Sequence, residues 1–101
     1  MDANYYCDSM YSELTSVRAR LYTIMRALGS MSDEEKEKAS PELTEMNRLA
    51  DDLTQKVDWL KRECPADWSP QKQDIDQTRR QLEEKINYWD EQHIPVAYTG
   101  G

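Results

Sequence analysis

The segment SPELTEMNRLADDLTQKVDWLKRECP, residues 40–65, carries the clearest structural signal in the chain. Its apolar residues recur at alternating steps of three and four, the spacing that places them along one face of an α-helix. They are Leu43, Met46, Ala50, Leu53, Val57, Leu60 and Cys64. Ser40 and Pro41 are typical of a helix start, because serine caps free N–H groups and proline fits the first helical position. Pro65 disfavours the helical conformation at the residue before it. We therefore predict a helix over residues 41–64.

The same spacing continues upstream of this segment. Within residues 3–28, apolar residues recur at heptad spacing without a break, and Gly29 follows where a helix C-cap would lie. The positions are Ala3, Cys7, Met10, Leu14, Val17, Leu21, Ile24 and Leu28. We therefore predict a first helix over residues 3–28. Between the two helices, Ser32 and Glu35 form a capping-box pattern, which predicts one or two helical turns.

Downstream, Ser69 and Pro70 repeat the start signal of the central segment. The positions that follow at helical spacing are Ile75, Arg79, Leu82, Ile86, Trp89 and His93. We predict a third helix over residues 70–92 and a short tail over residues 93–101. Because short connections join antiparallel neighbours, the whole chain, residues 1–101, is expected to form one all-α domain. Its architecture would be an antiparallel up-down-up three-helix bundle with coiled-coil-like heptad packing.

The charge of the chain limits the classes of partner that we expect it to bind. Asp and Glu number 20 against 13 Lys and Arg, and the net charge is −7. Nucleic acids and anionic membranes are recognised through Lys and Arg, so the excess of acid disfavours both. No apolar run approaches the roughly 18 residues needed to span a bilayer, and the first residues do not resemble a signal peptide. We therefore expect a cytoplasmic protein.

Cys7 and Cys64 are the two cysteines of the chain. In the predicted antiparallel register they fall in one layer at the same end of the bundle, at core positions that face each other. They could be two small buried thiols, as free cysteines usually are. Alternatively, they could form a reversible disulfide that pins the first helix to the second and stabilises it by roughly 4 kcal/mol. The spacing does not resemble a zinc site, and we expect no metal.

Arg79 interrupts the apolar face of the third helix. It could extend outward to an acid such as Glu13 or Asp58. It could instead fix the helix register or contact a partner. A local shift of the core position to Thr78 would also account for it.

The aromatic residues indicate a contact surface. Trp59 and Tyr88 fall at outward positions of the second and third helices, and tryptophan and tyrosine are enriched at binding hot spots. A tryptophan lying flat on a neighbouring helix would be the simpler explanation for Trp59. Two further tyrosines, Tyr5 and Tyr22, also face outward. The side chains expected to complete the core of the first helix are Tyr6, Tyr11 and Met25.

The sequence shows no catalytic signature. It lacks a glycine-rich phosphate loop, a nucleophile elbow and a zinc-binding helix motif, so we expect neither an enzyme nor a cofactor. The preferred interpretation is a non-enzymatic protein–protein interaction module, an adaptor, regulator or assembly component with an unidentified protein partner. Regular heptads would also allow self-association. The alternative is a redox-responsive switch that uses the Cys7–Cys64 pair.

Overall fold

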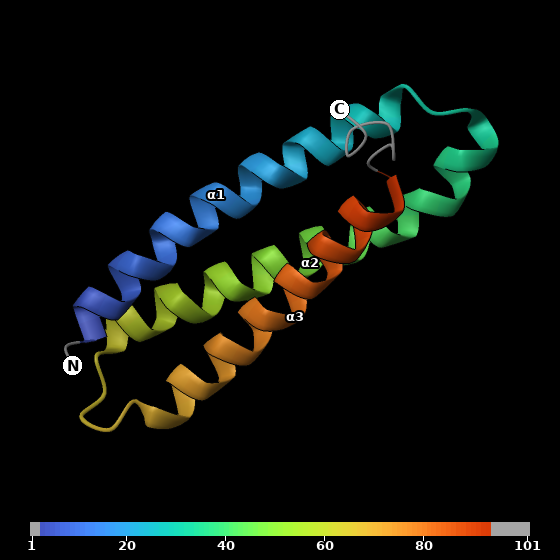
Figure 1. Cartoon of the computed structure of the whole chain (residues 1–101). Helices are drawn as coiled ribbons and strands as arrows, with labels where there is room; N and C mark the ends of the chain where they lie inside the picture. The colour runs from blue at the N-terminus through green and yellow to red at the C-terminus, as the bar shows by residue number, and fades with distance from the viewer. Residues whose placement is uncertain (1–2, 94–101) are drawn as a thin grey trace.

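The computed structural model describes residues 3–93, and it describes their side chains as far as Gln92. This part of the chain consists of three helices and no strands: α1 (Ala3–Gly29), α2 (Asp33–Glu63) and α3 (Ser69–His93) (Figure 1). The prediction of an all-α three-helix bundle is confirmed. The side chain of His93 and the tail from residue 94 lie outside the described residues.

Contacts between the helices give their relative directions. Along α1 and α2 the partner numbers rise in one helix as they fall in the other, so these helices run antiparallel. Along α1 and α3 the partner numbers rise together. The pairs are Asp8–Lys61, Tyr11–Asp58 and Arg18–Asp51 for α1 and α2, and Tyr6–Asp76, Glu13–Arg79 and Arg20–Asp90 for α1 and α3. Figure 1 shows the same course, with α2 returning beside α1 and α3 turning back again.

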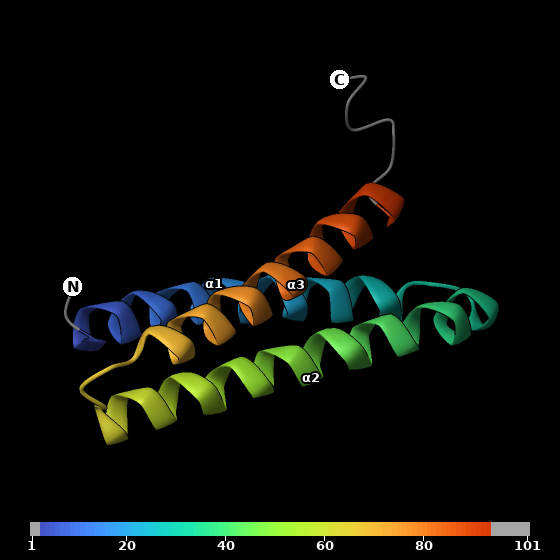
Figure 2. The same ribbon diagram turned by 90° about the horizontal axis from the view of Figure 1, so that it is seen from below.

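The helix α2 is the centre of the bundle. It packs closely along both α1 and α3, whereas the backbones of α1 and α3 approach each other at fewer points. Figure 2 shows why: α1 and α2 stay side by side, while the last turns of α3 move away from both. The first turns of α2 therefore pack against the end of α1. The side of α2 that faces α3 is less covered there, because α3 has moved away.

The core consists mainly of the predicted apolar positions. On α2, all the predicted positions from Leu43 to Leu60 are buried, together with Ala39 and Leu49. On α3 the buried residues are Ile75, Thr78, Leu82, Ile86 and Trp89. Trp68 packs partly against one end of this core, with its ring 5.3 Å from that of Tyr6. Burial at these spacings agrees with heptad packing, which stays a prediction.

The predicted start of the second helix at residue 41 is wrong. The helix begins at Asp33, because Ser32 and Glu35 form a complete capping box that satisfies free N–H groups at its end. Pro41 lies inside the helix, where it lacks an N–H to donate. Burial of Ala39 and Leu43 on either side keeps this segment packed against the bundle. The capping box therefore sets the start, and the loop after α1 is short.

The helix α2 ends just before Pro65, as predicted, but the side chain of Cys64 points outward. Cys64 is the C-cap, with a left-handed φ of 43°, and its N–H donates to the carbonyl of Leu60. Its side chain is exposed. The expectation that Cys64 occupies a core position is therefore wrong, because Pro65 takes the chain out of the helix at this residue.

Candidate functional site

The exposed aromatic residues of α2 and α3 mark the candidate site. Trp59 on α2 is 40% exposed and Tyr88 on α3 is 56% exposed. Each lines a groove between α2 and α3. The two residues therefore belong to one surface, which we call the α2–α3 face and define by the residues lining the two grooves.

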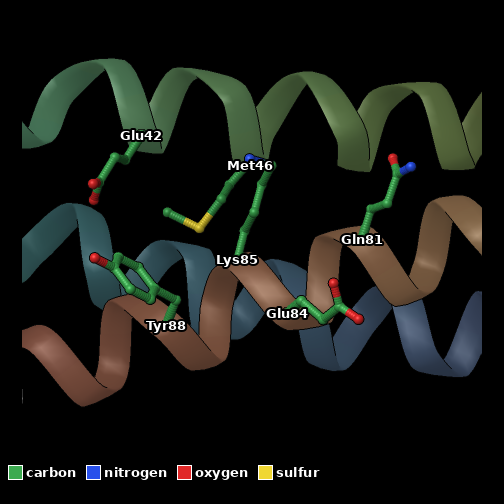
Figure 3. A pocket seen from close by; sticks show the side chains of 6 residues that line it. All are labelled: Glu42, Met46, Gln81, Glu84, Lys85 and Tyr88. Carbon is green, nitrogen blue, oxygen red and sulfur yellow. The ribbon is translucent and has the colours of Figure 1, made fainter.

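The larger groove contains Tyr88 and has a volume of about 630 Å³. We call it the Tyr88 groove, and it is lined by Glu42, Met46, Gln81, Glu84, Lys85 and Tyr88. In Figure 3, Tyr88 and Met46 lie in the space between the two helices, and Glu42 extends from α2 toward α3. Met46 is almost fully buried and forms an apolar floor. The groove thus offers an apolar surface bordered by carboxylates.

The smaller groove contains Trp59 and has a volume of about 240 Å³. It is lined by Lys56, Trp59, Gln71, Asp74 and Ile75. Ile75 in this lining is almost fully buried, whereas the Trp59 side chain is partly exposed. A Trp ring with this partial exposure can cover an apolar side chain of a partner while its N–H stays near water.

Lys56 lines the smaller groove and connects the two helices that form it. Its ammonium group lies 3.1 Å from a carboxylate oxygen of Asp52 and 3.0 Å from one of Asp74. It also donates a hydrogen bond of 3.0 Å to the hydroxyl of Thr78. Partial burial acts to lower the pKa of Lys56, but the hydrogen bonds to Asp74 and Asp52 outweigh it and the pKa is raised. Lys56 therefore stays charged and ties α2 to α3 midway along the face.

Arg79 does not contribute to this face. It lies toward α1, where its guanidinium group is 3.3 Å from Glu13 and 3.2 Å from Glu83. Thr78 takes the buried core position that the heptad spacing assigned to Arg79. Two of the alternatives for Arg79 are therefore found: it pairs with Glu13, and the core position is shifted to Thr78. A hydrogen bond shared with Glu83 is the main cause that raises the pKa of Glu13, and the same bond lowers that of Glu83. This cluster joins α1 to α3.

The two cysteines lie at the same end of the bundle but in different environments. Cys7 is fully buried, and its thiol donates to the carbonyl of Val57 over 3.8 Å. The thiol of Cys64 donates to the carbonyl of Lys61 over 3.2 Å. Both are free thiols. Burial is the main cause that raises the pKa of Cys7, so this residue is a poor nucleophile at neutral pH.

Two exposed residues of α1 were not expected to lie beside a groove. Met25 was predicted to complete the core, but it is 50% exposed. It lines a shallow groove of about 200 Å³ together with Tyr22. The prediction failed because Met25 lies beside the apolar seam of α1, where the groove residue Asn47 of α2 leaves half of it exposed. Tyr6 is buried and Tyr11 is partly buried, as expected.

The acidic residues in the Tyr88 groove were also missed by the sequence analysis. Glu42 and Glu84 resemble any other surface glutamate in the sequence. Asp74, Gln81 and Tyr88 follow one another at intervals of seven residues, which places them on one face of α3. This spacing is the sequence pattern that could have indicated the groove lining. The groove itself depends on the divergence of α3, which heptad spacing does not encode.

The described part of the chain contains no group of three or more His, Cys, Asp or Glu side chains that could hold a metal ion. Comparisons with protein family models, with curated protein sequences and with solved structures find no match for this chain. The arrangement of the α2–α3 face is therefore the basis for a functional proposal.

Proposed function

We propose that this protein is a non-enzymatic protein–protein interaction module that binds its partner through the α2–α3 face. It would serve as an adaptor, a regulator or an assembly component. The observation that carries the proposal is that Trp59 and Tyr88 are both exposed and both line grooves on the same face. Large aromatic side chains at grooves are typical of binding hot spots, since they bury much apolar area on association.

The charge of the chain disfavours nucleic acids and anionic membranes as its ligands. No helix in the described residues is long and apolar enough to cross a membrane. With a net charge of −7, the surface would repel phosphate groups of nucleic acids and anionic lipids. We therefore propose neither as a ligand, and we propose that the protein acts in the cytoplasm.

Site-specific photo-cross-linking in the source cell tests this proposal. A photoreactive amino acid replaces Gln81, which lines the Tyr88 groove and is exposed. The matched control carries the same amino acid at Ser12, an exposed residue of α1. We expect a defined protein adduct from position 81 and none from position 12, measured by mass spectrometry of the cross-linked product. Adducts from position 12 alone, or from neither position, would contradict the proposal.

The second candidate function is a redox-responsive switch. It is supported by the position of both free thiols at one end of the bundle, near enough that the charge of Cys64 helps to raise the pKa of Cys7. Oxidation by a disulfide compound would join the two sulfur atoms, while the S–S bond of that compound breaks and it leaves as two thiols that carry the two protons and two electrons. Because Cys64 is an exposed C-cap, its side chain would first have to turn inward.

The two thiols are expected to differ strongly in reactivity. With a thiol-specific reagent in native buffer, Cys64 should react at least about tenfold faster than Cys7, because Cys64 is exposed and Cys7 is buried. Variants Cys7→Ser and Cys64→Ser assign each kinetic phase. Similar rates for both thiols would contradict the described burial. The switch itself requires a 7–64 disulfide after treatment with oxidised glutathione, and its absence by peptide mapping would exclude that function.

A further inference from the structure

The Tyr88 groove combines an apolar base with carboxylates that are not neutralised within the bundle. Met46 and Tyr88 supply the apolar surface, and Glu42 on α2 and Glu84 on α3 lie on either side. Neither glutamate has a hydrogen bond or ion pair with another residue in the described part of the chain. By contrast, the neighbouring Glu45 is held by Arg48 at 2.6 Å. Two free carboxylates thus face any side chain that enters the groove.

We propose that the Tyr88 groove binds an amphipathic helix of a partner protein whose apolar side chains are flanked by lysine or arginine. This inference rests on the proposed function and specifies the partner. Apolar side chains of the helix would pack on Met46 and Tyr88, while its cationic groups would pair with Glu42 and Glu84. A cation can also lie over the face of a tyrosine ring.

The shape of the groove favours a helix over a compact ligand. Its volume of about 630 Å³ is within the roughly 300–1,000 Å³ of small-molecule pockets, but it is an open groove between two helices. The last turns of α3 diverge from α2 (Figure 2), and the groove is lined by side chains from both helices, as a groove that receives a helix would be. Recognition of an amphipathic helix by an apolar groove is a recurring mode of binding.

Charge also argues against a second copy of this chain as the occupant. Two copies would each bring a net charge of −7, and a twofold pairing through this face would set the same acidic groups opposite one another. Lys85 is the single cationic residue among those that line the groove, against two glutamates. A basic partner is complementary to this lining, and complementary charge both speeds association and selects the partner.

A synthetic helical peptide provides the probe. It has 18 residues, with leucines along one face and lysines flanking them, and a second peptide has glutamate in place of every lysine. Binding of each labelled peptide to the full chain is measured by fluorescence anisotropy at low salt. We expect the lysine peptide to bind and the glutamate peptide to bind at least about tenfold more weakly, because only the first complements the carboxylates.

Paired charge variants then locate the site. The double variant Glu42→Gln, Glu84→Gln should weaken binding of the lysine peptide at least about fivefold. The control Glu37→Gln, Glu63→Gln changes the net charge equally at exposed positions outside the groove, and it should change the affinity less than twofold. Both variants should keep the helical circular dichroism of the parent chain, since all four side chains are at the surface. Equal weakening by both variants, or weakening by neither, would overturn the inference.

The cross-linking experiment at position 81 separates this inference from the proposed function. Capture of a protein through an acidic or uncharged segment would overturn the basic-helix inference and leave the interaction function standing. A cross-linked dimer of this chain would also overturn it. If position 81 captures nothing, the interaction function itself is contradicted, whatever the peptides show.

Discussion

Replacing Leu53 by alanine is expected to lower the free energy of unfolding by about 3 kcal/mol. Leu53 is 1% exposed and lies in the middle of α2, the helix that packs against both α1 and α3. Truncation removes buried apolar surface and leaves a cavity that the surrounding helices fill only in part. Because small domains are stable by about 5–15 kcal/mol, the loss is a large share of the total. Urea unfolding followed by circular dichroism gives the value.

The matched control for this variant is Leu28→Ala. Leu28 is only partly buried, near the end of α1, so the same chemical change should cost about 1 kcal/mol or less. A loss at Leu28 equal to that at Leu53 would show that stability does not concentrate at the centre of α2. The described packing would then be wrong.

Much of the fold could be predicted from the spacing of apolar residues. α3 starts at Ser69, one residue before Pro70, and α2 ends at Glu63, two residues before Pro65. Two start signals precede the core of α2, the capping box at Ser32 and the Ser40–Pro41 pair, and the helix begins at the first. A capping box satisfies N–H groups at the helix end, whereas a proline can also lie inside a packed helix at some cost.

The candidate site could be predicted only in part. The outward positions of Trp59 and Tyr88 follow from helical spacing, and both residues are exposed. Their association with grooves does not follow from spacing, because it depends on how far α3 diverges from α2. Cys64 shows the opposite case: its spacing continues the apolar seam of α2, but the chain leaves the helix at that residue and the side chain is exposed.

Replacing Trp59 and Tyr88 together by alanine is expected to weaken partner binding at least about thirtyfold, as for truncated hot-spot residues. Both rings are accessible in the free protein and line grooves between α2 and α3, so a bound partner would bury them. Their outward parts contribute little to the core, and the double variant should remain folded. Retained circular dichroism and a cooperative unfolding transition check that point.

A matched pair of tyrosines provides the control for this double variant. Tyr5 and Tyr22 on α1 are 70% and 57% exposed, so they are at least as accessible as Trp59 and Tyr88. Neither lines the two grooves of the α2–α3 face. Their joint replacement by alanine removes exposed aromatic surface elsewhere and should change the affinity less than threefold.

The most direct test of the α2–α3 face as the binding surface is calorimetry with the protein captured through position 81. The parent chain, Trp59→Ala with Tyr88→Ala, and Tyr5→Ala with Tyr22→Ala are titrated side by side. The predicted result is a Kd at least about thirtyfold higher for the first pair and little changed for the second. An unchanged Kd for the first pair, or an equal rise for both pairs, would contradict the assignment of binding to this face.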